Sequence, residues 1–562
     1  MVGRHRVVWA DPTTAVAQAP IMKGAVLPTP GQRLVTRRDL LKYGVAGSAV
    51  VLLGPLAASS ASASARARVS AAARSSNAVK RGGTLRFARS IGPTTLDPAN
   101  TIIAGDIYTL DKILEPLYVT NPAGQLVPWL ATGYEVSTDH RTFTFSLRPG
   151  VKFSNGKPLV AEDVVFSINR TRKDAAGPLS FLDYAITDIV ARSTDSVVFQ
   201  LSQPWAPFLS DLSVFANAVL PADFAGQSEK DFLTAPIGTG PFTLDGFTPD
   251  ANSLTLKANP NYWQAGKPYL DAVEFLYVDN DNQRVLQVQG GQVDIIDTVP
   301  PANVSSLKAS SGISVDLFPA WQVDLLVMNE RLPQFADRHV RRAITYAIDR
   351  PALVHAASFG TAKPGGSFFP PSLEYYSAST PVLEYSLSRA KAELAQSKFP
   401  NGFSTKLLID GGVQKWVTFA QIIKAQLQSI NIDVDITPLD HSAFESTFQK
   451  YDYDMFIDYA INDISDPDEM ASFEVDVKNG GSESYWSDYD SPKAITLVHE
   501  AEAEYDSTKR AALYAQIQAI VAEDAPFVAL DYPPYIYAVS DHVNGFEVNP
   551  GGAYRLEDVW LT

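Results

Sequence analysis

The chain has 562 residues, too many for one ordinary hydrophobic core, so we expect two or three domains. It contains no cysteine, which excludes disulfides, thiolate metal sites, a cysteine nucleophile and a lipid-modified N-terminal cysteine. The first 81 residues hold 12 of the 46 basic and 2 of the 62 acidic residues, which leaves residues 82–562 with a net charge of −26. Such an acidic body repels nucleic acid and favours cationic or neutral ligands.

An export signal is indicated near the N-terminus. The adjacent Arg37 and Arg38 precede a weakly apolar run, Val45 to Ala58, that is too short to span a bilayer of about 30 Å as a helix. Small Ala-x-Ala steps follow this run. The order resembles a twin-arginine signal with cleavage after Ala63 or Ala65. A membrane anchor or a basic disordered tail is the alternative interpretation.

The N-terminal region is therefore expected to direct export rather than to form a folded domain. We expect residues 1–65 to be the twin-arginine signal region. Residues 66–81, rich in Ala, Ser and Arg, predict a flexible linker. The mature protein is then expected to act outside the cytoplasmic membrane.

In the body of the chain, strand patterns alternate with helix patterns. Apolar and polar residues alternate in 141–150 and 196–202, which is typical of half-buried strands. Apolar residues at helical spacing predict helices within 161–170, 419–432 and 510–526. This alternation indicates α/β or α+β lobes rather than a helical bundle or a β-sandwich.

One long motif carries a family resemblance. The stretch LRPGVKFSNGKPLVAEDVVFSINR at 147–170 closely resembles the signature of family 5 extracytoplasmic solute-binding proteins, the dipeptide, oligopeptide and nickel group of ABC-importer receptors. Further blocks resemble the family in its order: IGTGPF (237–242), NPNYW (259–263), VRRAITYAIDR (340–350), AQLQSINIDVDI (425–436) and KRAALYAQIQAIVAEDAPFVAL (509–530). Several long blocks in register are more specific than any one short motif, and they cover the body from about Gly82.

The resemblance implies an α/β, two-lobed, hinged fold like that of periplasmic binding proteins (type II, cluster C) with an extra inserted domain. The implied parts are lobe I (82–125, 234–320 and 531–562), inserted domain II (126–233) and lobe III (321–530). Strands at 323–329 and 527–532 are expected at or near the crossings between lobes. Such proteins close by hinge motion, and the ligand stabilises the closed state.

The implied function is that of a receptor without catalytic activity, which captures a peptide-like or other small solute and delivers it to an ABC permease. The expected partners are a small-molecule or oligopeptide ligand, the permease subunits and, during export, the twin-arginine translocase. We expect a monomer with no cofactor, no metal and no nucleic acid. A receptor for a sugar, an amine or a metal chelate is the alternative, and an exported hydrolase is a further one, although no Gly-x-Ser-x-Gly or His-Glu-x-x-His motif supports it.

The acidic stretch IDYAINDISDPDEM at 457–470 is the most distinctive chemical feature of the sequence. A calcium loop of the EF-hand type is excluded, because a loop starting at Asp463 has Pro467 at its fifth position and no glycine nearby. A carboxylate pair of the glycosidase type stays open, because its members may be far apart in sequence. In peptide-binding relatives, an aspartate shortly before an acidic-Pro pair binds the free α-amino group of the peptide, and Asp463 matches that position.

The other carboxylates of the stretch are expected to be solvated loop residues or helix caps. They are Asp458, Asp466, Asp468 and Glu469. A carboxylate enclosed with a ligand ammonium gains charge-assisted hydrogen bonds that offset its desolvation. The resemblance therefore assigns ligand binding to Asp463 alone within this stretch.

The sequence says less about which residues would bind the carboxyl end of a peptide ligand. Dipeptide binders of the family use an arginine for the ligand carboxylate in a loop that reads DGGVQKWVT here, at 410–418, with Lys415 and no arginine. This departure leaves longer peptides and cationic or neutral solutes as candidates. Four aromatic residues are expected either to line the cleft and stack on a ligand or to lie in the core: Trp321, Trp416, Tyr459 and Trp486.

Overall fold

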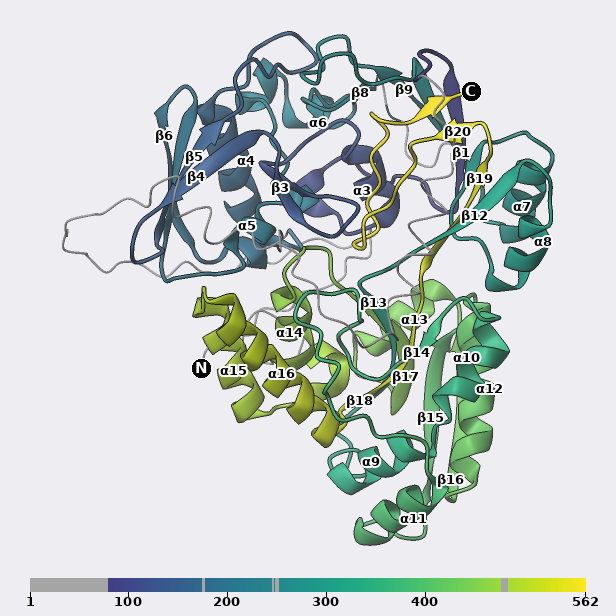
Figure 1. Cartoon of the computed structure of the whole chain (residues 1–562). Coiled ribbons are helices and arrows are strands. Elements are labelled where there is room, and N and C mark those ends of the chain that lie inside the picture. The colour runs from purple at the N-terminus through teal and green to yellow at the C-terminus, as the bar shows by residue number, and fades with distance from the viewer. Residues whose placement is uncertain (1–78, 174–176, 245–246, 248–251, 477–483) are drawn as a thin grey trace, which may run out of the picture.

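The computed structural model describes residues 79–173, 177–244, 247, 252–476 and 484–562. The predicted signal region and nearly all of the predicted linker lie outside the described residues. Two bodies are visible in Figure 1, an upper one that contains most of the first half of the chain and a lower one that contains most of the second half. No helix within the described ranges is both long enough and apolar enough to cross a membrane.

A seven-stranded sheet forms the core of the upper body. Its strands, in spatial order, are β12 (Ile313–Phe318), β19 (Tyr535–Ser540), β11 (Ile295–Ile296), β1 (Thr84–Arg89), β10 (Ala272–Tyr277), β9 (Ser253–Ala258) and β8 (Phe242–Thr243). Helices α3 (Ala104–Leu110), α7 (Asp281–Gln289) and α8 (Val304–Lys308) belong to the same body. The sheet is mixed, since β1 pairs in parallel with β10 and β11, whereas β19 is antiparallel to both of its neighbours.

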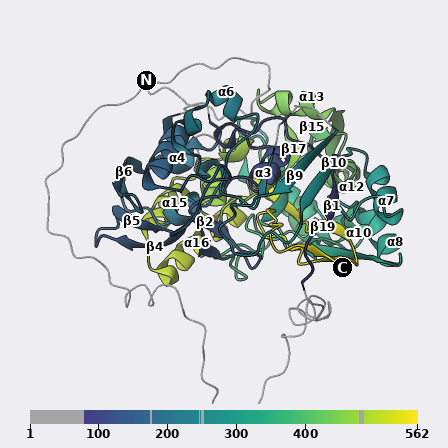
Figure 2. The ribbon, with the colours of Figure 1, turned by 90° about the horizontal axis from the view of Figure 1, so that it is seen from above.

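A four-stranded antiparallel sheet lies beside it. Its order is β4 (Ala131–Val136), β5 (Thr142–Leu147), β7 (Ser196–Leu201) and β6 (Ile186–Ser193), and helix α4 (Ala161–Lys173) packs against it. Figure 2 shows this sheet and helices α7 and α8 on opposite sides of the molecule. Small elements complete the upper body: β2 (Tyr118–Thr120), β3 (Leu126–Pro128), α5 (Phe208–Asp211), α6 (Glu229–Phe232), β20 (Val543–Asn544) and β21 (Trp560–Leu561).

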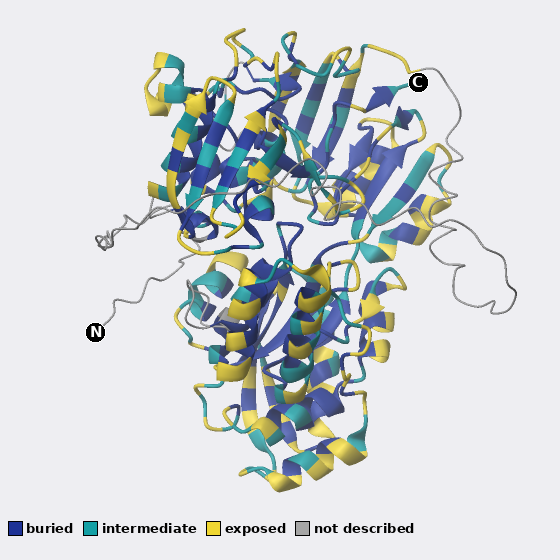
Figure 3. Ribbon diagram, turned by 60° about the vertical axis from the view of Figure 1, so that its left-hand side comes forward, coloured by how far each residue is buried: buried dark blue, intermediate teal, exposed yellow. Residues whose placement is uncertain are grey.

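The lower body contains a six-stranded sheet with apolar clusters on both faces. Its order is β14 (Lys363–Pro364), β18 (Phe527–Tyr532), β13 (Gln322–Met328), β17 (Met455–Ile461), β15 (Phe403–Asp410) and β16 (Ile432–Leu439). Its helices are α9 (Arg338–Ala347), α10 (Arg350–Ser358), α11 (Leu387–Gln396), α12 (Gln414–Gln428), α13 (His441–Phe448), α14 (Asp468–Val475), α15 (Pro492–Ala503) and α16 (Ser507–Asp524). Figure 3 shows many buried residues in the sheets of both bodies, and exposed residues on the outer helices and loops and on some strands.

The chain crosses between the two bodies through two neighbouring pairs of strands. Strand β12 continues into β13 through residues 319–321, and β18 continues into β19 through residues 533–534. Because β12 pairs with β19 and β13 pairs with β18, the two connections lie next to each other (Figure 1). Two short connections that lie side by side in this way have the geometry of a hinge.

The predicted elements agree with this architecture. The predicted strands are β5 and β7, and the predicted helices are α4, α12 and α16. Helix α12 ends earlier than the apolar pattern suggested, because Asn431 has a φ of 61° and the chain turns into β16 at Ile432. Strands β2 and β3 pair with each other on either side of residue 125, and the end of β18 at Asp531 and Tyr532 pairs within the six-stranded sheet.

Gly238, in one of the family-like blocks, is required for packing. A Cβ atom at this position would lie 1.8 Å from the backbone oxygen of Ile113. Gly238→Ala is therefore expected to lower the free energy of unfolding by about 1–3 kcal/mol or more, because backbone cannot give way as a flexible side chain can. Gly133→Ala is the matched control, since no atom lies within 4 Å of its added Cβ. Equal stability of the two variants in urea denaturation would contradict this packing argument.

Candidate functional site

Four side chains from both bodies gather beside the hinge, and we call them the junction group. They are Tyr108 of α3, Tyr535 of β19, Tyr459 of β17 and Asp463, which follows β17. Burial raises the pKa of Tyr108 and of Tyr535, and the charge of Asp463 adds to the shift. The hydroxyls of both tyrosines also flank the backbone at Gly552, where an added Cβ would lie 2.3 Å and 2.9 Å from them. The junction group therefore consists of two residues of the upper body and two of the lower body.

Asp463 has an available carboxylate. The side chain is half-buried, and within the described part of the chain its carboxylate has no hydrogen bond or ion pair. Burial raises the pKa of Asp463 to about 6. The backbone is held in place because the N–H groups of Asp463 and Ile464 donate to Glu469 Oε2 at 2.6 Å and 3.3 Å. A fixed carboxylate without an internal partner is suited to receive an external cation.

Tyr459 is accessible and lies close to carboxylates of the acidic stretch. Its side chain is 42% exposed, yet burial raises its pKa, and the carboxylates of Asp458 and Asp463 raise it further. Its ring centroid is 6.3 Å from that of Trp416, so two of the predicted aromatic residues lie together near Asp463.

Lys415 is enclosed by carboxylates, and we call Lys415, Asp324 and Asp531 the lysine triad. The Lys415 Nζ atom lies 2.6 Å from Asp324 Oδ2 and 3.5 Å from Asp531 Oδ1. Although burial opposes it, attraction to the two carboxylates raises the pKa of Lys415. Trp416 donates its indole N–H to Asp324 Oδ2 at 2.8 Å, so this tryptophan supports the triad and is itself buried.

The other two predicted aromatic residues lie in the core. Trp321 is 1% exposed and donates its indole N–H to the carbonyl of Ser372 at 2.9 Å. Its backbone N–H donates to Pro550 in the upper body, so it packs at the hinge. Trp486 is also buried, and its ring contacts Phe448 and Tyr451. The structure therefore brings Tyr459, Trp416 and Asp463 together and places Trp486 in a core cluster.

The expectation that the remaining carboxylates of the acidic stretch are solvated is wrong. All four are buried, with exposed fractions of 8% or less: Asp458, Asp466, Asp468 and Glu469. Asp466 is bound by both terminal nitrogens of Arg510, one at 2.8 Å, because α16 packs against this segment. Burial raises the pKa of Asp468 to about 8, and Glu469 supports the backbone at Asp463. For Asp466, charge compensation from α16 thus replaces the expected hydration.

The segment after Asp463 also contacts the four-stranded part of the upper body. The hydroxyls of Ser465 and Ser210 lie 2.9 Å apart, and the N–H of Ala206 donates to the carbonyl of Glu502 at 2.6 Å. The Tyr505 hydroxyl donates to the carbonyl of Trp205 at 2.8 Å. These contacts hold the lower body against the upper one on this side of the hinge.

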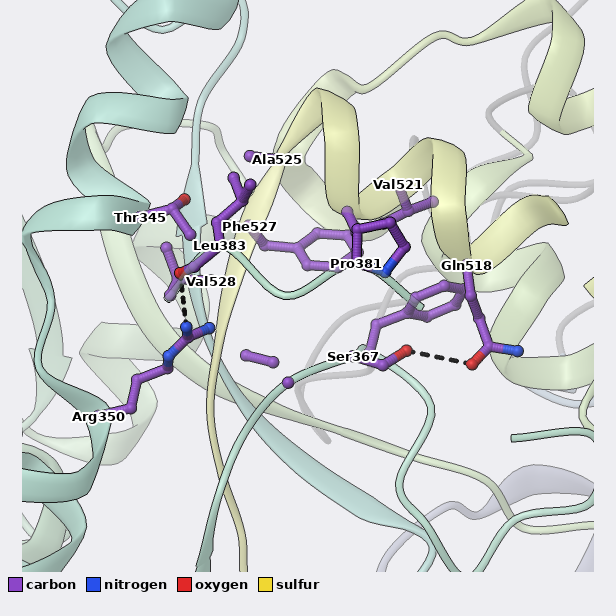
Figure 4. A pocket seen from close by; sticks show the side chains of 14 residues that line it. Thr345, Arg350, Ser367, Pro381, Leu383, Gln518, Val521, Ala525, Phe527 and Val528 are labelled. Atoms are coloured by element: carbon purple, nitrogen blue, oxygen red, sulfur yellow. Dashed lines mark hydrogen bonds between the residues drawn. The ribbon is translucent and has the colours of Figure 1, made fainter. Parts of the chain in front are cut away.

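A small pocket lies elsewhere in the lower body (Figure 4). It is lined by residues that include Arg350, Ser367, Gln518 and Phe527, and its volume of ≈ 30 Å³ has room for about one or two waters. Arg350 donates to the carbonyl of Leu383 there. The pocket is too small for a peptide. Among the described residues, no group of three or more His, Cys, Asp and Glu side chains is arranged to hold a metal ion.

Sequence reasoning missed several residues of the site. Tyr108, Tyr535 and Glu469 were not predicted to take part, and neither was the enclosure of Lys415 by Asp324 and Asp531. The partners come from segments far apart in the chain, and no local pattern in the sequence links them. In the structure, the register of β13 sets Asp324 opposite both Tyr459 and Asp531.

Comparisons with known proteins agree with this geometry. Residues 125–510 match the family described as bacterial extracellular solute-binding proteins, family 5. The chain is 29% identical over 512 residues to di/tripeptide-binding protein 2 of Pseudomonas aeruginosa, a match that covers 85% of this chain and 95% of that protein.

Solved structures show the same fold. The ABC transporter-associated periplasmic binding protein DppA from Helicobacter pylori, in complex with the peptide STSA, is 27% identical, with a TM-score of 0.77 over 86% of this chain and 98% of that one. The oligopeptide-binding protein AppA from Bacillus subtilis, in complex with a nonapeptide, has a TM-score of 0.75 at 23% identity and covers 86% of this chain and 100% of that one.

Two bodies joined by a double-stranded hinge define a solute-binding protein of the ABC-importer type, and the predicted two-lobed fold class is confirmed. The chain belongs to the family 5 bacterial extracellular solute-binding proteins.

Proposed function

We propose that this receptor captures a peptide-like solute with a free amino group between its lobes and delivers it to an ABC permease. The available carboxylate of Asp463 at the hinge is the observation that carries the proposal. The similarity to proteins named for di- and tripeptides, and to one solved with a peptide, supports the same class of ligand.

The junction group supplies the chemistry of capture. The ligand ammonium would donate charge-assisted hydrogen bonds to Asp463, whose position Glu469 fixes. The accessible ring of Tyr459 would cover the adjacent part of the ligand. Tyr108 and Tyr535 approach from the other lobe, so the ligand contacts both lobes only when they are closed. Ligand binding thereby favours the closed state.

The remaining parts of the proposal concern organisation and location. The lobes are assigned as lobe I (82–125, 234–320 and 531–562), inserted domain II (126–233) and lobe III (321–530). The protein acts as a monomer without catalytic activity, outside the cytoplasmic membrane. Arg37 and Arg38 direct its export through the twin-arginine translocase.

A ligand-linked closure test follows from this proposal. A binding peptide at a hundredfold excess over Kd is expected to stabilise the native state by about 2.7 kcal/mol, because it binds only the folded protein. Thermal unfolding measures the stabilisation, and small-angle scattering at the same concentrations is expected to show compaction. The same peptide with its amino group acetylated is the matched control and should do neither. Tight binding with no change in shape would contradict capture by lobe closure.

A further inference from the structure

The four-stranded part of the upper body packs on the lower body through apolar and aromatic contacts. In one buried cluster, Ile464 of the lower body packs with four side chains of the upper body: Leu179, Leu182, Val214 and Ala216. The rings of His140 and Tyr505 stack across the same interface, with their centroids 3.9 Å apart. Because each contact joins the two bodies, opening of the hinge breaks all of them and admits water to this interface.

The same interface buries six carboxylates, and we call them the interface carboxylates. Two belong to the upper body and four to the lower body, each with an exposed fraction of 6% or less: Asp183, Asp211, Asp466, Asp468, Glu469 and Glu502. Asp211 directly follows Ser210, whose hydroxyl lies 2.9 Å from that of Ser465 in the lower body. The charges of Asp466 and Asp468 act on Asp211, so the two sets are close enough to repel each other across the interface.

Arginine compensates part of this negative charge. Arg510 of the lower body binds Asp466 with both terminal nitrogens, and Arg172 of the upper body acts on Asp183. Further titratable groups lie around the interface carboxylates: Asp188, Glu374, Asp463, Asp476 with its partner His499, Tyr375, Tyr505 and Tyr514. The surroundings are therefore rich in carboxylates and phenols.

Several interface carboxylates suit the protonated form in the closed state. Within the described residues, one oxygen in each of Asp183, Asp468 and Glu502 is buried without a hydrogen-bond partner, which is costly for an ionised group. Burial, together with repulsion from neighbouring carboxylates, raises the pKa of Asp468 to about 8 and that of Glu502 to about 9. Burial also raises the pKa of Asp211 well above its ordinary value. In an open, hydrated interface these values return toward about 4, so the open state holds fewer protons.

We propose that closure of the two bodies takes up protons at the interface carboxylates, so that the closed state predominates near neutral pH and the bodies separate as the pH rises toward 9. This inference rests on the closure that the proposed function invokes, but not on the class of ligand. The closed state keeps protons that the open state releases, and each such proton lowers the ratio of closed to open molecules by about tenfold per pH unit.

Other groups at the interface do not titrate in this range. Burial lowers the pKa of His140, so its ring is neutral above pH 6.5. Burial raises the pKa of Tyr505 and of Tyr514, so their hydroxyls keep their protons. The pKa of Asp463, about 6, also lies below the range.

Single-molecule energy transfer in the ligand-free protein tests the inference. The chain has no cysteine, so Thr194→Cys and Gln516→Cys provide one exposed labelling site on each body. Closed and open molecules are counted at about pH 7, 8 and 9, and we expect their ratio to fall by about tenfold or more per pH unit. A ratio that does not fall with pH would overturn the inference, whether the molecules are open or closed throughout.

A double variant links the pH dependence to the interface. Asp211→Asn with Glu502→Gln removes one carboxylate from each body and keeps the side-chain shapes, so the dependence is expected to fall to about threefold per pH unit or less. Glu500→Gln, at an exposed position on the same helix as Glu502, is the control and should keep the full dependence. An unchanged dependence in the double variant would overturn the assignment, and would point to groups such as Lys112, whose pKa burial lowers to about 8. If the double variant does not fold, the counts for the unsubstituted protein decide the inference.

The failure of the inference differs from the failure of the proposed function. Closure on addition of peptide, with populations in the ligand-free protein that do not change with pH, keeps the peptide receptor and rejects the proton linkage. Populations that change with pH as expected, in a protein that binds no peptide with a free amino group, keep the proton linkage and reject the peptide receptor.

Discussion

Replacing Asp463 with asparagine is expected to weaken the binding of a peptide with a free amino group more than a hundredfold. The variant keeps the shape of the side chain but leaves the ligand ammonium enclosed with a neutral partner, and breaking such a pair costs about 3–5 kcal/mol. Titration calorimetry with the native and the N-acetylated peptide measures the effect. The unsubstituted protein should lose affinity on acetylation, whereas the variant should be nearly indifferent to it. Equal losses in the two proteins would show that Asp463 does not bind the amine.

The same residue predicts the pH dependence of binding. Because burial raises the pKa of Asp463 to about 6, the carboxylate becomes protonated as the pH falls through 6, and affinity for an ammonium group should fall with it. The raised pKa also affects the stability of the ligand-free protein. Above pH 6 the ionised carboxylate lowers the free energy of unfolding, and this destabilisation disappears as the pH falls and the carboxylate becomes protonated. Asp463→Asn should therefore fold at least as stably as the unsubstituted protein at pH 7 while binding poorly. Asp433→Asn is the control for both measurements, since its side chain is exposed.

Arg510→Gln is expected to destabilise the ligand-free protein by about 3–5 kcal/mol. Arg510 is 5% exposed and binds Asp466 with both terminal nitrogens, so its loss leaves a buried carboxylate without its cation. Asp468 and Glu502 are close enough that their charges act on one another and on Arg510. Urea denaturation followed by circular dichroism measures the loss.

Two further variants separate charge from shape in this prediction. Lys509→Gln, at an exposed neighbouring position on α16, should change the free energy of unfolding by less than about 1 kcal/mol. Adding Asp466→Asn to Arg510→Gln removes the unpaired charge and should restore part of the stability. A double variant no more stable than the single one would contradict this explanation and would point to the other hydrogen bonds of Arg510, from Nε to the carbonyl of Ala501 and from a terminal nitrogen to the Tyr514 hydroxyl.

The sequence predicted the fold class because long blocks such as residues 147–170 carry the family's turns and core positions together, and such patterns are local. It also pointed to Asp463, through the position of that residue relative to Asp466 and Pro467. It did not predict that Asp466 is buried, because the compensating cation, Arg510, comes 44 residues later on another helix. The state of Lys415 depends in the same way on two strands that are distant in sequence. Burial and charge compensation depend on contacts between distant segments, so the sequence did not predict the environments of Asp466 and Lys415.

The place of β19 in the seven-stranded sheet has a consequence for biosynthesis. This strand, Tyr535–Ser540, is made long after β11 and β12, yet it lies between them in the sheet. Until it emerges from the ribosome, both neighbours present open edges that invite pairing with other chains. The sheet that begins with β1 is therefore completed only once β19 has been made, and its many contacts between distant segments favour slow folding. Premature termination before Tyr535 would leave an aggregation-prone fragment rather than a smaller working receptor.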